Sequence, residues 1–237
     1  MPRRAVLSDE QRMALLALPD DETTLVQHWT LSEDDLAIIV RRRRPHNRLG
    51  FAIQLCALRY PGRLLRPGEL IPDTPLAFVA EQLQIAPEVL ADYATRGPTR
   101  YEQLDALREG FGFTQFSRPL RAALQEWLLP IALTTTSGAG LARSLLGECR
   151  RRRIIVPGIS SVERMVAQAL LDAERHVAEH LTRGLETGQR RLLDALLLPH
   201  AGTNLSGLGW VRQPPGKPGR KTFAVIIRRL ALLRDIG

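Results

Sequence analysis

Apolar residues recur every three to four positions along most of the chain, and this spacing predicts helices. The longest such pattern follows Ser160 and Glu163, which have the spacing of a capping box. Its apolar positions are Val162, Met165, Val166, Ala169, Leu170, Ala173, Val177 and Leu181. A stripe that is apolar over so many turns indicates a helix that packs against a core. No strand-like alternation of useful length occurs, so we expect an all-α fold.

Capping signals predict further helices in the first half of the chain. Ser8 with Gln11 and Ser32 with Asp35 have the serine-to-position-three spacing of N-terminal caps. Asn47 can cap the helix that comes next, because a short polar side chain can accept the unpaired N–H groups of a first turn.

Two short helices around a tight turn suggest a helix-turn-helix. Thr74, followed by proline, can open the first of them, and Pro87 can open the second. This signal is weak alone, since many helical hairpins share it. Apolar spacing predicts later helices over residues 119–133 (with a break near Pro130), 141–153, 189–198 and 223–236.

Glycine and proline divide the chain. Gly110 and Gly112 flank a phenylalanine, and residues 213–220 form a basic Pro/Gly segment. We expect two small helical domains over residues 1–110 and 111–205, each with a helix-turn-helix-like element. Residues 206–237 would be a basic Pro/Gly linker and a terminal helix, the start of a further helical segment.

The charge balance indicates a polyanionic partner. Lysine and arginine number 33 against 25 acidic residues, which gives a net charge of +8. Arginine dominates, and its planar guanidinium donates two hydrogen bonds at once to a phosphate. Aromatic residues are only 5% of the chain and do not alternate with the basic runs. Duplex binding is therefore favoured over base stacking with a single strand.

The basic residues gather in three places. Residues 41–66 contain eight arginines and no acidic residue. Interaction with a helix dipole, about 0.3–1 kcal/mol for each charge, explains one or two of residues 41–44 but not four, because like charges repel. The run at 150–153 has Glu148 and Glu163 nearby, so structural pairing explains it equally well. Residues 212–229 can follow a DNA groove or form a solvated linker.

The predicted DNA-binding residues come from these three regions and from the long helix. They are Arg41, Arg42, Arg43, Arg44, His46, Asn47, Arg48, Arg59, Arg63, Arg150, Arg151, Arg152, Arg153, Arg164, Lys217, Arg220 and Lys221. The helices that begin near Asn47, Pro87 and Ser160 are the candidates for reading bases.

Catalytic and metal-binding patterns do not stand out. Cys56 and Cys149 lack metal-ligand spacing and fit small buried residues. His176 and His180 lie one turn apart, but without the HExxH pattern, so we interpret them as facing solvent. The sequence contains no P-loop, GxSxG or dinucleotide fingerprint, and many carboxylates lie at predicted helix starts. We expect no enzyme activity, cofactor or metal.

The apolar runs are far shorter than the roughly 20 residues that cross a bilayer, and the first residues lack the apolar core of a signal peptide. We therefore expect no membrane partner and a cytoplasmic location.

Residues 31–63, LSEDDLAIIVRRRRPHNRLGFAIQLCALRYPGR, resemble the amino-terminal region of Tn-three family transposases, the large enzymes of replicative bacterial transposons. The part NRLGFAIQLCALRYPGR is the most specific. FVAEQL, ATRGPTRYEQL, GFGFTQF and GLGWVRQPPGKPG follow in the same order. The resemblance covers essentially the whole chain.

The resemblance implies sequence-specific binding of duplex DNA at transposon terminal inverted repeats, in the service of DNA transposition. It also implies that the DDE catalytic core lies beyond this chain. The expected partners are double-stranded DNA, the rest of the transposase and a possible homodimer, in the bacterial cytoplasm and on the nucleoid when bound. The alternatives are a stand-alone helix-turn-helix regulator, a protein-interaction or dimerisation module, and an enzyme that cleaves DNA.

Overall fold

The computed structural model describes residues 6–93, 97–199 and 204–236. Over these residues it contains twelve α-helices, one 3-10 helix and two isolated β-bridges, which confirms the all-α fold class. The chain divides into two compact units, Met1–Arg175 and His176–Gly237. The domain limits expected at residues 110 and 205 stay predictions.

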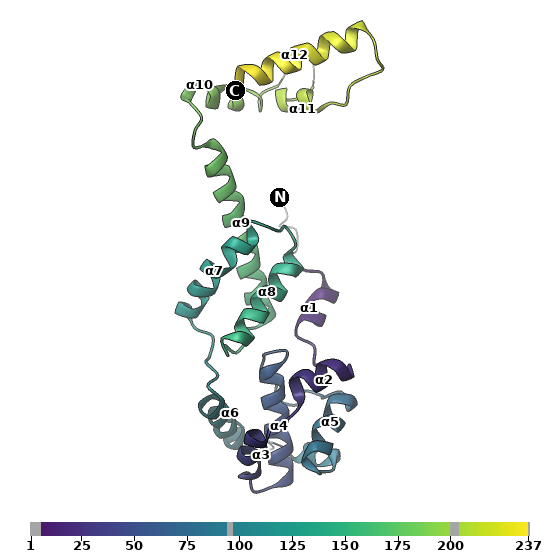
Figure 1. Cartoon of the computed structure of the whole chain (residues 1–237), viewed down its shortest axis with the longest axis vertical. Coiled ribbons are helices and arrows are strands. Elements are labelled where there is room, and N and C mark those ends of the chain that lie inside the picture. The colour runs from purple at the N-terminus through teal and green to yellow at the C-terminus, as the bar shows by residue number, and fades with distance from the viewer. Residues whose placement is uncertain (1–5, 94–96, 200–203, 237) are drawn as a thin grey trace. The chain divides into compact units, whose positions relative to one another are not determined.

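Figure 1 shows the helices of both units, coloured from purple at the start of the chain to yellow at its end. The first unit holds α1 (Asp9–Leu15), α2 (Glu22–Trp29), α3 (Glu33–Val40), α4 (Pro45–Arg59), α5 (Asp73–Leu83), η1 (Pro87–Asp92), α6 (Gly97–Phe111), α7 (Arg118–Ala132), α8 (Gly138–Arg151) and most of α9 (Ile159–Thr182). The second unit holds the end of α9, then α10 (Thr187–Ala195), α11 (Gly207–Arg212) and α12 (Arg220–Ile236).

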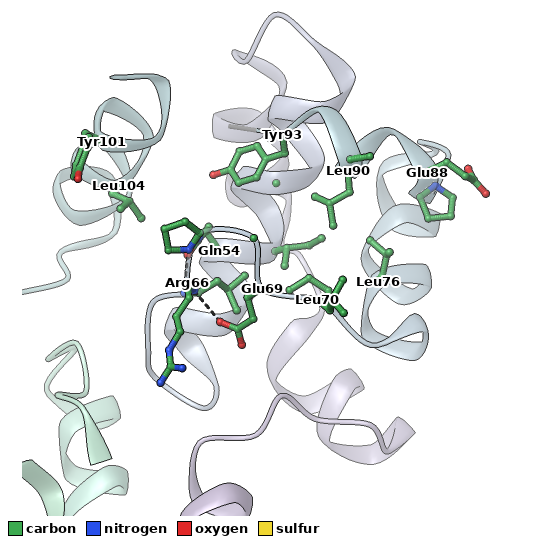
Figure 2. A pocket seen from close by; sticks show the side chains of 18 residues that line it. Gln54, Arg66, Glu69, Leu70, Leu76, Glu88, Leu90, Tyr93, Tyr101 and Leu104 are labelled. Atoms are coloured by element: carbon green, nitrogen blue, oxygen red, sulfur yellow. Dashed lines mark hydrogen bonds between the residues drawn. The ribbon is translucent and has the colours of Figure 1, made fainter. Parts of the chain in front are cut away.

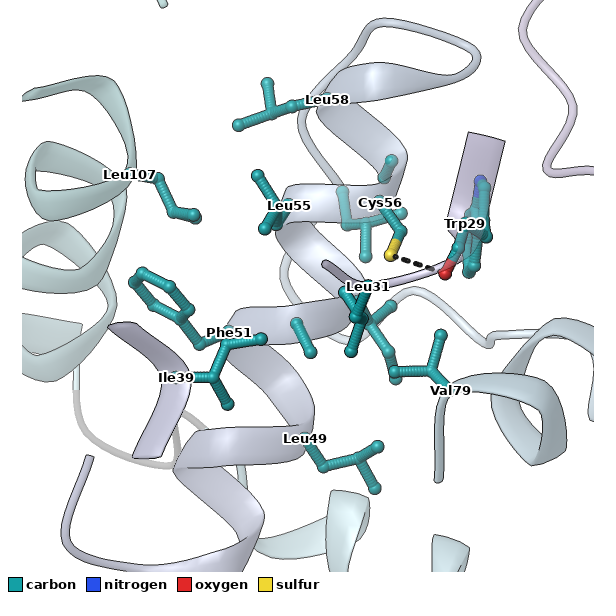
Figure 3. Close-up of a cluster of buried hydrophobic side chains, with 14 of the residues drawn as sticks. Trp29, Leu31, Ile39, Leu49, Phe51, Leu55, Cys56, Leu58, Val79 and Leu107 are labelled. Carbon is teal, nitrogen blue, oxygen red and sulfur yellow. Dashed lines mark hydrogen bonds between the residues drawn. The ribbon is translucent and has the colours of Figure 1, made fainter. Parts of the chain in front are cut away.

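Two hydrophobic cores form within the first unit. The first core surrounds α4, in which every residue from 49 to 58 is buried, and α2, α3, α5, η1 and α6 pack around it. Figure 3 shows Phe51, Leu55 and Cys56 of α4 among side chains from the neighbouring helices. The indole N–H of Trp29 donates to the Tyr60 carbonyl oxygen at 2.9 Å, so the largest buried side chain also has its polar atom satisfied.

The second core is formed by α7, α8 and α9, and it is closed by Leu7, which precedes α1 and is buried. The predicted stripe of α9 is buried at Val162, Met165, Val166, Ala169 and Ala173, which confirms its core-facing role in the first unit. In the second unit, the last stripe residues, Val177 and Leu181, are exposed. The prediction of one continuous core-facing stripe was therefore wrong at its end.

Both predicted capping boxes at the start of the chain are confirmed. The Ser8 and Ser32 hydroxyls accept from the backbone N–H groups of Gln11 and Asp35, and those side chains accept from the serine N–H groups in return. The predicted helix at Asn47 begins earlier, with Pro45 in its first turn and Arg44 as the N-cap residue. Proline presets the φ angle of a helix, so it can open the helix without a polar cap.

The capping box predicted at Ser160 was wrong. The helix α9 begins at Ile159, and Ser160 lies inside it. The Glu163 carboxylate instead accepts from the Arg12 guanidinium at 2.7 Å, across 151 positions in sequence. The long-range charged bond replaces the local one.

Four other elements differ from the predictions. Thr74 does not cap α5, which begins at Asp73 with Pro72 as its N-cap residue. The segment that opens at Pro87 is a six-residue 3-10 helix, and α7 continues through the exposed Pro130. That proline lies in the last turn, and its missing bond would involve Glu126, whose exposed position gives its carbonyl access to water. The helix α2 was not predicted, although Asp21 caps it by accepting from the Thr24 N–H at 2.8 Å.

Candidate nucleic-acid interface

The turn between α3 and α4 consists of Arg41, Arg42, Arg43 and Arg44, and we call it the arginine turn. Two arginines hold its shape. The Arg42 guanidinium lies 4.3 Å from the centre of the buried Phe51 ring, and Arg48 Nε donates to the Arg42 carbonyl oxygen at 2.7 Å. These two side chains, both predicted to contact DNA, therefore have a structural role in the turn.

The other members of the arginine turn point to solvent. Arg41, Arg43 and Arg44 are exposed, and among the residues that the structure describes they form no ion pair and no side-chain hydrogen bond. They lie directly before the N-terminal end of α4, whose backbone N–H groups add partial positive charge. Three guanidinium groups beside a helix N-terminus form a site suited to phosphate.

His46 and Asn47 belong to the first turn of α4 and are half-buried. The rest of the helix is inaccessible, because residues 49–58 are buried on every side. A helix that lies in a DNA groove must present one face along its length. Only the first turn of α4 can therefore reach a base. The base-reading residues proposed for the helix near Asn47 are thus limited to this turn.

Arg59, another predicted contact, is bound to a carboxylate. Its two terminal nitrogens donate to Asp35 at 2.6 and 2.8 Å, and the Asp35 side chain is almost fully buried. Burial acts to raise the pKa of this carboxyl, but the bonds from Arg59 and from Ser32 outweigh it and the pKa is lowered. The pair joins the start of α3 to the end of α4.

Arg63 is similarly occupied. It donates two bonds to the Glu69 carboxylate, at 2.5 and 2.9 Å, and a third from Nε to the Leu16 carbonyl oxygen at 2.8 Å. Burial acts to raise the pKa of Glu69, but the bonds from Arg63 and from the Arg66 N–H outweigh it and the pKa is lowered. The pairing of Arg59 with Asp35 could not be predicted from local spacing, because these residues are 24 positions apart in the sequence.

In the second arginine run, residues 150–153, two members bind the buried carboxylate of Glu148. Arg151 makes two bonds of 2.7 Å to Glu148, and Arg152 makes one of 2.5 Å. The bonds from Arg151 are the largest cause that lowers the pKa of Glu148 to about 2, and those from Arg152 add to them. Arg153 donates to the Phe111 carbonyl oxygen at 2.8 Å.

Arg150 lies under the aromatic ring of Tyr60, 4.9 Å from its centre, and Nη1 donates to the Pro61 carbonyl oxygen at 3.3 Å. It is half-buried, and burial lowers the pKa of its guanidinium. All four arginines of the second run thus have protein partners.

The helix α9, which begins near Ser160, is the third helix that was predicted to read bases, and one of its faces is exposed. Arg164 is exposed and bonds back to the Ser160 carbonyl oxygen and the Ser161 hydroxyl, both at 3.2 Å, and Gln168 is exposed one turn further on. Unlike α4, this helix has an accessible polar face. The 3-10 helix at Pro87 is only six residues long.

The second unit is the more basic of the two. Residues 176–237 contain ten basic and four acidic residues, whereas residues 1–175 contain 23 and 21. Lys217, Arg220 and Lys221 are exposed, and the Thr222 hydroxyl donates to the Lys217 carbonyl oxygen at 2.6 Å. Most of the net charge of the chain is therefore in its last quarter.

A cavity of about 810 Å³ lies beside α4 and away from the arginine turn. Figure 2 shows its side chains, with Leu76 from α5, Leu90 and Tyr93 from the η1 segment, and Leu104 from α6. The Tyr93 ring lies so close to Gly50 that a Cβ there would be 2.2 Å from it. The lining is mainly apolar, and its ionisable side chains are Arg66, Glu69, Glu88, Tyr93 and Tyr101.

Four further observations concern metal binding, the cysteines, the histidines and membrane spans. The described part of the chain contains no cluster of three or more histidine, cysteine or acidic side chains able to hold a metal ion. Cys56 and Cys149 are buried as predicted, and burial raises the pKa of their thiols to about 12 and about 11. His176 and His180 are exposed, as predicted. No helix in the described part of the chain is long and apolar enough to cross a membrane.

Residues 6–169 match a family described as a domain of unknown function (DUF4158). The whole chain is similar to the transposases of several bacterial transposons. It is 40% identical to the transposase for transposon Tn21 from Escherichia coli over 230 residues, which are 97% of this chain and 23% of that protein. The chain belongs to the amino-terminal region of the Tn-three family transposases.

Two other Tn-three family relatives have the same relationship. Identity is 37% to the transposase for transposon Tn501 from Pseudomonas aeruginosa, over 97% of this chain and 23% of the relative. It is 34% to the transposase for transposon Tn1546 from Enterococcus faecium, over 98% of this chain and 24% of the relative. The chain spans about a quarter of the length of the curated relatives that it matches.

Proposed function

We propose that this chain binds duplex DNA at the terminal inverted repeats of a transposon and serves DNA transposition as part of a larger transposase. The Tn-three family relatives supply the context, since they are transposases that align with nearly all of this chain. We propose that its contribution is binding and that strand cleavage takes place elsewhere in the transposase.

The arginine turn is the observation that carries the proposal. The first unit has 23 basic and 21 acidic residues, and several of its arginines are tied to carboxylates. Arg41, Arg43 and Arg44 differ, because they are exposed and the described residues offer them no carboxylate. Adjacent like charges cost folding energy, and a phosphate backbone removes that cost.

Base reading needs side chains that reach into a groove. His46 and Asn47 lie in the first turn of α4, and Ser160, Arg164 and Gln168 lie on the exposed face of α9. Asparagine and glutamine match the edge of adenine, and arginine matches that of guanine. We propose that these two helix starts read sequence, while Lys217, Arg220 and Lys221 add phosphate contacts from the second unit.

The test compares an inverted-repeat duplex with a scrambled duplex at several salt concentrations. The triple variant R41A/R43A/R44A keeps Arg42 and Arg48, which hold the turn. Each lost phosphate contact should flatten the slope of log affinity against log salt by about 0.9, so the triple should flatten it by nearly 3. Affinity for both duplexes should fall together.

A matched control is R118A/R121A/R143A, which removes the same charge from exposed positions on α7 and α8. It should change the slope much less than the triple variant of the arginine turn does. The proposal fails if the wild-type chain does not prefer the inverted repeat, or if both triple variants flatten the slope equally. An affinity that does not change with salt concentration would favour a protein-interaction module instead.

A further inference from the structure

The two cores of the first unit meet along one short segment, residues 154–156. Ile154 and Val156 belong to the second core, while Ile155 between them is buried in the first. The Val156 N–H donates to the Gly62 carbonyl oxygen at 2.8 Å, and Gly62 follows directly after α4 and its Tyr60–Pro61 turn. We call the two cores with their helices the first lobe and the second lobe.

Gly62 allows this close approach. Its φ of +103° lies in a region that side chains rarely adopt, and a Cβ there would be 3.0 Å from both Arg150 Cγ and Val156 Cγ2. The two lobes therefore touch at a position where any side chain would have to displace Arg150 or Val156.

Arg150 closes the same contact from α8 in the second lobe. Its guanidinium lies against Tyr60 and donates to the Pro61 carbonyl oxygen, so one side chain contacts two residues of the first lobe. The Tyr60 ring also stacks on His28 of α2, with centroids 4.8 Å apart and planes 3° from parallel. A half-buried cation that satisfies a carbonyl and an aromatic face is suited to joining two packed bodies.

Other bonds cross between the lobes nearby. Arg63 donates to the Leu16 carbonyl oxygen, and Leu16 packs on the second core. Arg153 donates to the carbonyl oxygen of Phe111, which packs on the first core. The lobes are thus connected by several bonds, and Arg150 is the side chain that contacts both Tyr60 and Pro61 of the first lobe.

We propose that Arg150 and residues 60–62 form an interlobe clamp that fixes the arginine turn relative to the start of α9, and so sets the spacing of the two DNA segments that the chain can bind together. The effect of the clamp on DNA spacing rests on the proposed function, whereas the joining of the two lobes does not. Arg150 is then a positioning residue that acts through the orientation of the lobes, and not a phosphate contact.

The experiment uses the 237-residue chain and the inverted-repeat duplex. Footprinting first identifies the segments that each lobe protects, and a second duplex carries five additional base pairs between them. That insertion turns one segment by about half a helical turn. The wild-type chain should lose affinity about tenfold or more on the longer duplex, which corresponds to about 1.4 kcal/mol.

The Arg150→Met variant keeps much of the side-chain volume and removes the cation. It should bind the original duplex more weakly but lose less than about threefold on insertion, because uncoupled lobes tolerate the new spacing. Arg150→Lys should restore much of the wild-type discrimination. The control Arg143→Ala removes one exposed charge from the same helix and should weaken binding to both duplexes by the same factor. A lost phosphate contact would behave like this control.

A second measurement does not depend on DNA. Hydrogen exchange of the amides in α4 and α8 should report one shared opening event in the wild-type chain and two separate events in Arg150→Met. Gly62→Ala keeps every charge and crowds Arg150, so it should also separate the exchange of α4 from that of α8. This variant replaces Arg150→Met in the test if Arg150→Met does not fold.

The outcomes separate the clamp from the proposed function. If the wild-type chain shows no preference for the inverted repeat but exchange still uncouples in the variants, the proposed function fails and the joining of the lobes stands. If the variants keep both the wild-type spacing dependence and the shared exchange, the clamp is overturned.

Discussion

The chain contains two runs of four arginines, residues 41–44 after α3 and residues 150–153 at the end of α8, and the fold treats them differently. In the arginine turn, three of the four side chains are exposed and meet no carboxylate among the described residues. In the second run, all four side chains bond to or pack on protein groups. The same residue type in the same number is thus bound to protein groups in one run and left mostly exposed in the other.

The residue one turn earlier explains much of the difference. Glu148 lies three positions before Arg151 and four before Arg152, the spacings at which helical side chains meet. The corresponding position in the first run is Ile39, three before Arg42 and four before Arg43, and it carries no charge; Ile38 and Ala37, three and four positions before Arg41, are also uncharged. An arginine run is available to a phosphate when the preceding turn of its helix supplies no acid.

The largest expected effect comes from removing that acid. Glu148→Gln leaves the two guanidinium groups beside a buried neutral amide, and we expect a loss of about 2 kcal/mol in the free energy of unfolding. Urea denaturation at neutral pH measures it. The control Asp105→Asn breaks an exposed pair with Arg108 and should cost less than about 0.5 kcal/mol. Equal effects of the two variants would contradict the special role of Glu148.

The pH dependence of this difference follows from the lowered pKa of Glu148. Its folded value of about 2 lies below the ordinary 4.5, so the stabilisation is complete above pH 4.5 and disappears as the pH falls through about 2. The stability gap between the wild-type chain and Glu148→Gln should therefore be constant from pH 7 to 5 and shrink between about 4.5 and 2. A gap that stays constant down to pH 2.5 would show that the charge is not responsible.

The comparison also shows what could be predicted from the sequence. Most local rules held: both capping boxes at Ser8 and Ser32 form, the buried part of the α9 stripe faces a core, and the proximity of Glu148 to the second run was visible as spacing. The capping box predicted at Ser160 and the cap predicted at Asn47 do not form. Such features depend on residues three or four positions apart, for which helix geometry alone decides the neighbours.

Contacts between distant residues could not be predicted in this way. Arg59 and Arg63 look like members of the first basic region, but Asp35 and Glu69 bind them, and Arg150 meets Tyr60 and Pro61 from the far side of a lobe boundary. The burial of α4 on all sides follows from the packing of five neighbouring elements, so its unsuitability for lying in a groove appears only in three dimensions.

The smallest expected effect would make the first run resemble the second. Ala37 is exposed on α3 and lies four positions before Arg41, so Ala37→Glu gives that arginine a helical partner. An exposed pair of this kind contributes only about 0.3–0.5 kcal/mol, and stability should barely change.

DNA binding should respond more clearly than stability. If Arg41 contacts a phosphate, Ala37→Glu should flatten the salt dependence by about 0.9, the contribution of one contact. Ala37→Gln tests the side chain without its charge and should leave the slope unchanged. Ala123→Glu adds the same charge at an exposed position of α7, so it corrects for the overall loss of positive charge. If Ala37→Glu and Ala123→Glu flatten the slope equally, the preceding turn does not decide whether Arg41 reaches a phosphate.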